Sequence, residues 1–154
     1  MIEAIPEQIK HAIYLDAFLP ENNKTGFDVI GEPYITDWQI LAQTNGDGWL
    51  MRADEATIDN CGVTEAAHRD FLRDRITDFS LNYLRTKLFI GTNYLNMAKS
   101  YIRCTGRSYC FDLMIPHFER AKQKGDQIYS MDSPHDLVIS HPQELVDFLR
   151  SVSV

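Results

Sequence analysis

The chain has 154 residues, of which 44% are hydrophobic and 24% are charged, so it is long enough for one domain with a hydrophobic core. Its net charge is −7 and it has no basic cluster, which argues against nucleic acid or an anionic membrane as a partner. No apolar run approaches the roughly 18 residues that a membrane-spanning helix needs. The first residues are acidic and include a proline, so they do not form a signal peptide, and we expect a cytoplasmic protein.

Short apolar segments predict three buried strands of a sheet. The first is nearly continuous in apolar and aromatic residues, as is typical of parallel strands that are covered on both faces. The predicted strands are residues 12–18, 100–105 and 127–131.

Helices are predicted after the second and third strands. The first spans 112–124 and ends at Gly125, although Pro116 makes a start near Ile115 an alternative. The second spans 144–151. A strand-helix-strand-helix order requires parallel pairing with right-handed crossovers, so the fold class is α/β, with about three parallel strands flanked by helices.

The segment between the first two strands, residues 31–99, is predicted to be an inserted, mainly helical cap of the single domain 1–154. Loops are indicated by Asn45-Gly46-Asp47-Gly48 and by Asn60-Cys61-Gly62, and Trp38 and Trp49 are assigned to loops as well. Thr64 is predicted to be the N-cap of one helix, and a second helical stretch is predicted over 79–84. The aromatic side chains Trp38, Trp49, Tyr83 and Phe89 could form the core of this cap or line an acyl pocket.

Four segments, in the same order, resemble small bacterial esterase-like α/β-hydrolases related to hydroxynitrile lyases and methylesterases. They are Tyr14-Leu15-Asp16-Ala17-Phe18-Leu19-Pro20-Glu21-Asn22, Gly62-Val63-Thr64 followed by Arg75-Ile76-Thr77, Tyr101-Ile102-Arg103-Cys104-Thr105, and Ser133-Pro134-His135-Asp136-Leu137 followed by His141-Pro142-Gln143-Glu144-Leu145. The match covers only the C-terminal half of that family. The first five core strands, the oxyanion segment and the G-x-S-x-G nucleophile elbow have no counterpart. The resemblance therefore implies a partial α/β-hydrolase fold and an esterase-like activity that an isolated chain would lack.

His135 follows the last predicted strand, where an α/β-hydrolase holds its general base. In the resembled mechanism its imidazole takes a proton from a nucleophile and later gives it to the leaving group. The alternative is a loop histidine that makes only structural hydrogen bonds. Pro134 stands where the family often has glycine, which would stiffen the approach to His135.

The acid that would orient His135 is predicted to be Asp16, at the end of the first strand. Many such hydrolases place this acid after the penultimate strand, but that loop has no carboxylate before Asp112. Some α/β-hydrolases carry the acid where Asp16 stands, although Asp16 could equally bond backbone amides at the strand end. Asp136 adjoins His135 and is predicted to be a turn residue at the start of a helix.

The candidate nucleophiles lie in the loop after the second predicted strand. Gly106-Arg107-Ser108-Tyr109-Cys110 lies between a strand and a helix and is close to the elbow pattern, so Ser108 is a candidate. The family resemblance places no nucleophile in this loop. Cys110 would need a base and a lowered pKa, and is otherwise a buried thiol at a helix start.

The remaining side chains predict neither a metal site nor a cofactor. The three cysteines Cys61, Cys104 and Cys110 form no C-x-x-C pair and are expected to be free thiols, and no histidines have metal-ligand spacing. The expected ligand is a small ester-like molecule. Because a short sheet with an open apolar edge must be covered, we expect a homo-oligomer or a partner that supplies the missing N-terminal half. The competing hypothesis is a non-catalytic binding or interaction module derived from the same fold.

Overall fold

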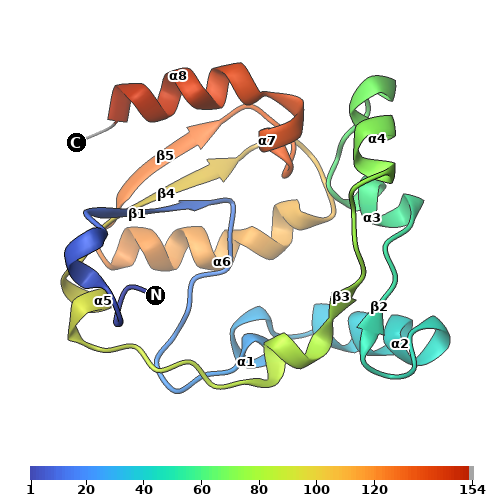
Figure 1. The fold of residues 1–154 in the computed structure, drawn as a ribbon, viewed down its shortest axis with the longest axis horizontal. Coiled ribbons are helices and arrows are strands. Elements are labelled where there is room, and N and C mark those ends of the chain that lie inside the picture. The colour runs from blue at the N-terminus through green and yellow to red at the C-terminus, as the bar shows by residue number, and fades with distance from the viewer. Residues whose placement is uncertain (153–154) are drawn as a thin grey trace.

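The computed structural model describes residues 1–152, and a parallel sheet with the strand order β1-β4-β5 lies at its centre (Figure 1). The strands are β1 (His11–Leu15), β4 (Ala98–Cys104) and β5 (Gln127–Met131). Tyr14 lies opposite Tyr101, and Tyr101 lies opposite Ile128, so side chains of one parity share a face across all three strands. The predicted α/β class and the parallel three-stranded sheet are confirmed.

The first strand ends earlier than predicted, at Leu15 rather than at Phe18. The next residue, Asp16, has a φ of 40°, a left-handed conformation that aspartate adopts more readily than most residues. The Asp16 N–H still donates to the carbonyl oxygen of Ile102 at 2.7 Å, so the chain leaves the sheet only after this bond. Asp16 is therefore the first residue after the strand, and its backbone is still held by β4.

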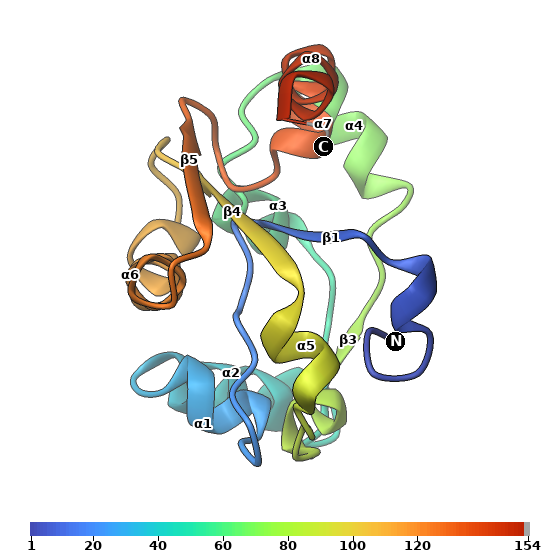
Figure 2. The same cartoon turned by 90° about the vertical axis from the view of Figure 1, so that its left-hand side faces the viewer.

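Helices cover the two faces of the sheet, with α6 (Cys110–Gln123) on one face and α8 (Pro142–Val152) on the other (Figure 2). Buried Tyr101 and Ala121 pack together on the α6 face. Cys104 and Leu145 pack together on the α8 face, next to the short helix α7 (Leu137–Ser140).

Helix α6 begins two residues before the predicted start and continues through Pro116, so a helix start near Ile115 is wrong. Proline removes one N–H donor from the helical ladder. The helix tolerates this loss because Leu113 and Met114 bury its inner face. The glycine signal at its end is confirmed, since Gly125 has a φ of 79° directly after the last turn.

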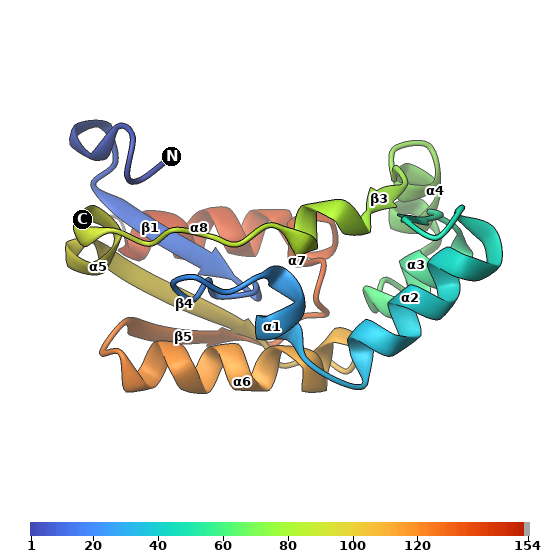
Figure 3. The same cartoon turned by 90° about the horizontal axis from the view of Figure 1, so that it is seen from below.

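Between β1 and β4 the chain forms short helices and a two-stranded antiparallel sheet. Most of these elements lie beyond one end of the central sheet, whereas α5 (Thr92–Asn96) lies at the other end, where β4 begins (Figure 3). We call α1 to η2 the cap. The elements are α1 (Gly26–Ile30), α2 (Tyr34–Asn45), β2 (Leu50–Met51), α3 (Glu55–Asn60), α4 (Ala66–Arg73), β3 (Phe79–Ser80), the 3₁₀ helix η2 (Leu81–Arg85) and α5 (Thr92–Asn96), while another 3₁₀ helix, η1 (Pro6–Gln8), precedes β1.

Several details of the cap differ from the prediction. Trp38 lies in helix α2 and not in a loop, and the N-cap of α4 is Glu65 and not Thr64. Tyr83 and Phe89 are 76% and 80% exposed, so they do not form the core. The cap is instead built from small clusters, such as the one of Ile58, Val63 and Leu72. Such dispersed contacts leave little periodicity to detect in the sequence.

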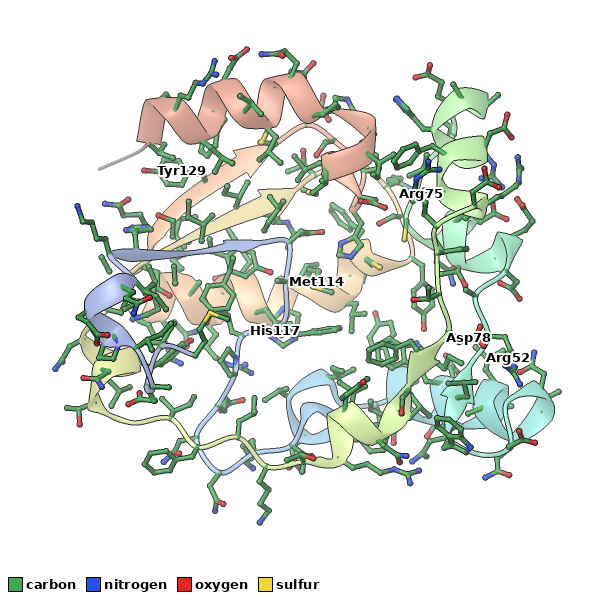
Figure 4. All side chains as sticks on the ribbon, viewed as in Figure 1. Arg52, Arg75, Asp78, Met114, His117 and Tyr129 are labelled. Carbon is green, nitrogen blue, oxygen red and sulfur yellow. The ribbon has the colours of Figure 1, made fainter. Side chains whose placement is uncertain are left out.

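An ion pair joins the segments that follow β2 and precede β3. Arg52 Nη1 lies 2.6 Å from Asp78 Oδ2, and the backbone N–H of Ala53 donates to Asp78 Oδ1 at 2.9 Å (Figure 4). No helix within residues 1–152 is long and apolar enough to cross a membrane.

Candidate active site

The carboxyl ends of the three parallel strands lie at one edge of the sheet, and the predicted site residues follow them directly. Asp16 follows β1, and His135 lies in the loop that leads from β5 to α7. Ligands of open α/β sheets bind at this edge, because the loops there converge.

Asp16 and His135 are in direct contact. Asp16 Oδ2 lies 2.7 Å from Nδ1 of His135, although the two residues are 119 positions apart in the sequence. Asp16 is only 2% exposed, and its second oxygen, Oδ1, accepts the backbone N–H of Cys104 at 3.1 Å. The carboxylate is therefore fixed by the end of β4, and it fixes the orientation of the imidazole ring in turn.

The surroundings of His135 favour its charged form. Burial lowers the pKa of His135, but side-chain hydrogen bonds with Asp16 and with Cys110 raise it by more, so the net pKa is well above that of a free histidine. The side chain keeps 26% of its surface exposed and can be reached from the cleft. A histidine held in this way can accept, keep or deliver a proton at a fixed position.

A cleft of about 210 Å³ lies between the cap and the start of α6, and His135 lines it. Most of its lining surface is apolar, and the cap contributes polar groups from α2, from the loop after β2 and from α3. The lining residues are Trp38, Leu41, Asn45, Met51, Arg52, Asp54, Ala56, Thr57, Asn60, Cys61, Tyr109, Cys110 and His135. Of the four cap aromatics, Trp38 is the one in this lining.

His135 also lines a second hollow. It is lined by Asp16 and His135 from the strand ends and by Met114 from α6, which Figure 4 labels beside His117. Because Met114 lies four residues after Cys110, the same face of α6 carries both side chains toward His135. Helix α6 therefore contributes to the cleft and to this second hollow.

The cap reaches His135 through the turn at Gly62, whose φ is 78°. A Cβ atom at this glycine would lie 3.0 Å from Cβ of Pro134 and 3.1 Å from Cβ of Ser108. Glycine is therefore required for this close approach. The contact places the neighbouring Cys61 in the cleft, and the Cys61 carbonyl accepts the backbone N–H of Asp136 at 3.4 Å.

The structure places Ser108 outside the cleft of His135. It lines a separate hollow with Thr105, Arg107, Phe111 and Asp112. Gly106, the first glycine of the elbow-like pattern, has another role, because a Cβ there would lie 2.6 Å from the carbonyl oxygen of Ser133. This glycine lets the loop after β4 pack closely against the loop after β5, and the pattern in the sequence reflects that packing.

The thiols differ in their surroundings. Cys104 is buried, whereas Cys61 and Cys110 are half-buried and both line the cleft. Burial, with smaller contributions from neighbouring groups, raises the pKa of Cys61 and of Cys104 to about 11 in each case. Residues 1–152 contain no group of three or more His, Cys, Asp and Glu side chains placed to hold a metal ion.

Comparison with solved structures agrees with this architecture. An extracellular α/β-hydrolase from a Paenibacillus species superposes on 95% of this chain with a TM-score of 0.75 and 16% sequence identity. Tomato methylketone synthase I, solved with 2-tridecanone, superposes on 99% with a TM-score of 0.70 and 16% identity. The fold is an α/β-hydrolase fold. A pyrethroid hydrolase from Sphingobium faniae also matches, over 97% of this chain, with a TM-score of 0.63 and 19% identity.

The chain spans less than two thirds of the length of these proteins, namely 63% of the Paenibacillus protein, 64% of the tomato protein and 63% of the Sphingobium protein. The sequence matches no protein-family model and no curated protein. At such identities the comparison shows the fold, and the chemistry must be argued from the site.

Proposed function

We propose that this chain carries the acid–base part of a carboxylic-ester hydrolase site, with His135 as the general base and Asp16 as the acid that orients it. The observation that carries the proposal is the 2.7 Å contact between His135 Nδ1 and a carboxylate that is 2% exposed. Asp16 binds Nδ1, so Nε2 is the nitrogen that can exchange a proton with a nucleophile or a leaving group.

The cleft supports a small ester with an apolar acyl group as the substrate. Trp38, Leu41 and Tyr109 line it beside His135, and apolar walls with a few polar groups are typical of small-molecule sites. The tomato neighbour was solved with a long-chain ketone, and another neighbour is a hydrolase of pyrethroids. The ketone has an apolar chain next to a polar carbonyl, and the proposed substrate has the same combination.

Hydrolysis of p-nitrophenyl butyrate tests the role of His135. We expect His135→Ala to reduce the rate above background by about 10²-fold or more, because a positioned general base contributes that much. His141→Ala is the matched control, since His141 bonds Ser140 at 2.8 Å and does not line the cleft. Equal rates for the wild type and His135→Ala would refute the proposed function.

The alternative is a non-catalytic binding module, and the position of Ser108 outside the cleft favours it. In that case the wild type would bind 2-tridecanone saturably in calorimetry and would hydrolyse no ester faster than His135→Ala does.

We also propose that another polypeptide covers the outer edge of β1. This strand pairs only with β4 within the described residues, and Ile13 on it is 42% exposed. Light scattering after size exclusion would show a dimer if a second copy covers the edge. Ile13→Glu would then give monomers, whereas Leu95→Glu on α5 would not. A monomeric wild type would favour cover by a separate segment, such as the additional length present in the neighbours.

A further inference from the structure

The residue after Asp16 is held by a tyrosine that the proposed acid–base pair does not include. Tyr101 lies at the middle of β4 and is 0% exposed. Its hydroxyl donates a hydrogen bond to the carbonyl oxygen of Ala17 at 2.9 Å, across 84 positions of the sequence. Because Ala17 directly follows Asp16, this bond holds the chain one residue beyond the carboxylate of the proposed pair.

The backbone of Asp16 requires such a restraint. Its φ of 40° is a left-handed conformation, which a residue with a side chain keeps only where its surroundings hold it there. On one side of the turn, the N–H of Asp16 donates to the carbonyl oxygen of Ile102 at 2.7 Å. On the other side, Tyr101 holds the carbonyl group of Ala17. Two adjacent residues of β4 therefore hold this turn from both sides.

The turn determines where the Asp16 carboxylate lies. Oδ1 of this carboxylate accepts the N–H of Cys104 at 3.1 Å, and Oδ2 lies 2.7 Å from Nδ1 of His135. Both contacts depend on the direction of the Cα–Cβ bond of Asp16, which the backbone dihedrals of the turn set. Since hydrogen bonds weaken as their distance and angle depart from the optimum, a shift of the turn would weaken the contact with His135.

Tyr14 provides an internal comparison for Tyr101. The two residues lie opposite each other on β1 and β4, and the hydroxyl of Tyr14 donates to that of Tyr94 at 3.0 Å. Tyr94 belongs to α5, at the end of the sheet where β4 begins, whereas Asp16 lies at the carboxyl end. Each tyrosine therefore makes a hydroxyl hydrogen bond inside the fold, but that of Tyr101 is the one that reaches the proposed site.

We propose that Tyr101 is a positioning residue of this site, whose hydroxyl holds the turn at Asp16 and thereby keeps the carboxylate in contact with His135. Tyr101 lines neither the cleft nor the second hollow, so it acts through Asp16 and not on a substrate. The effect on catalysis rests on the proposed function. The contact between Asp16 and His135 can be measured without any substrate.

NMR titration of the His135 ring in the full chain tests the positioning directly. Burial lowers the pKa of His135, but hydrogen bonds with Asp16 and Cys110 raise it, with a net value of about 10. We expect Tyr101→Phe to lower this pKa by roughly 0.5 or more, because a displaced carboxylate stabilises the imidazolium less. Tyr14→Phe should leave the pKa unchanged. Equal pKa values in the wild type and in Tyr101→Phe would overturn the inference.

Hydrolysis of p-nitrophenyl butyrate separates positioning from a general loss of stability. We expect kcat to fall about 5- to 50-fold in Tyr101→Phe while KM stays within about twofold, because a displaced acid–base group slows the chemical step without weakening substrate binding. Tyr14→Phe also loses a hydroxyl hydrogen bond, and it should keep the wild-type kcat. If kcat fell equally in the two variants, loosening of the sheet would explain the effect and the inference would be wrong.

A double-mutant cycle shows whether Tyr101 acts through the carboxylate. In Asp16→Asn no carboxylate charge remains to be positioned. Adding Tyr101→Phe to that variant should therefore change kcat and the pKa of His135 much less than it does in the wild type. Effects of the same size in both backgrounds would show that Tyr101 acts by another route, which contradicts the inference.

Tyr101→Phe should fold, because it keeps the ring that packs 6.0 Å from the ring of Phe118. Circular dichroism checks the fold, and amide hydrogen exchange provides a second measurement of the turn. The N–H of Asp16 should exchange at least about 5-fold faster in Tyr101→Phe than in Tyr14→Phe, because local opening sets the exchange rate. Equal exchange rates in the two variants would show that the hydroxyl of Tyr101 does not hold the turn.

The outcomes also separate this inference from the proposed function. If hydrolysis does not depend on His135, the proposed function fails, and the titration still decides whether Tyr101 maintains the contact of Asp16 with His135. If hydrolysis depends on His135 but Tyr101→Phe changes neither kcat nor the pKa of His135, the inference alone fails.

Discussion

A half-buried histidine, His135, and a fully buried one, His117, have opposite environments in this chain. His135 contacts the buried carboxylate of Asp16 and faces a cleft. His117, on α6, is completely buried, packs its ring 5.1 Å from that of Phe18, and accepts the backbone N–H of Leu19 at Nδ1. Burial, with a smaller contribution from Arg120, lowers the pKa of His117 to about 4, whereas the pKa of His135 is raised.

The difference shows that burial alone does not make a histidine functional. Both rings lose water, which disfavours the charged form of each. At His117 nothing offsets this loss, so the ring is neutral and serves the packing of α6 against the chain after β1. At His135 the side-chain hydrogen bonds with Asp16 and Cys110 overcome it, so the pKa of the ring is raised and a proton taken up there is held more strongly.

The two sites also contribute opposite slopes to the pH dependence of stability. His117 has a folded pKa below its unfolded value of about 6.5, so unfolding takes up a proton and stability falls as pH falls from about 6.5 toward about 4. His135 has a raised folded pKa, so its stabilisation is complete below about 6.5 and is lost as pH rises through the folded value. Because the His117 contribution falls below pH 6.5 and the His135 contribution falls above it, the two together make the folded chain most stable near pH 6.5.

Asp16→Asn should have the largest effect, because it removes the charge that distinguishes the two histidines. We expect about 10²- to 10⁴-fold slower ester hydrolysis, in the range found when the acid of a triad is neutralised. We also expect the loss of stability above pH 6.5 to flatten, because the pKa of His135 would move toward that of an ordinary histidine.

The amide oxygen of asparagine can still accept the N–H of Cys104, so the strand end should remain in place. Chemical denaturation between pH 6.5 and 9 measures the slope, and the p-nitrophenyl butyrate assay measures the rate. An unchanged slope in Asp16→Asn would show that the carboxylate does not set the pKa of His135.

His117→Asn should have an intermediate effect, confined to stability. The amide oxygen can replace Nδ1 as the acceptor for Leu19, but the group does not titrate, so the fall in stability between pH 6.5 and pH 5 should disappear. That slope is at most about 1.4 kcal/mol per pH unit in the wild type. Denaturation of the wild type and of His117→Asn over this range measures it, with His141→Asn as the control. If the slope persists in His117→Asn, groups other than His117 cause the fall in stability at low pH.

The sequence predicted the parts of this arrangement that depend on local pattern. The three strands, the helix end at Gly125 and the placement of His135 after the last strand all follow from short apolar runs and turn residues. The partnership of Asp16 with His135 came from the family resemblance, and the structure places the two in contact across 119 positions.

The rest could not be predicted because long-range packing decides it. The positive φ of Asp16 ends β1 early, and no periodicity records it. Helix α2 was not predicted because few of its side chains are buried, so apolar residues do not recur at helical spacing. Within α2 only Ile35 and Ala42 are buried. Cys110 was predicted to be a buried thiol at a helix start, but it is half-buried and lines the cleft, and α6 starts two residues earlier than predicted.

Arg52→Gln should have the smallest effect. It breaks an exposed ion pair and so provides a reference for the loss of the buried Asp16–His135 contact. Arg52 and Asp78 lie 2.6 Å apart, compared with 2.7 Å for Asp16 and His135, but the side chains of Arg52 and Asp78 are 47% and 35% exposed. Water and salt screen such a pair, so we expect a smaller change in the denaturation midpoint than for Asp16→Asn at any pH above 6.5. The change should also shrink as salt is added, whereas that of Asp16→Asn should persist, because the buried carboxylate is shielded from ions. If both variants showed the same salt dependence, the burial of Asp16 would not be what distinguishes His135, and the contrast between the two histidines would need another cause.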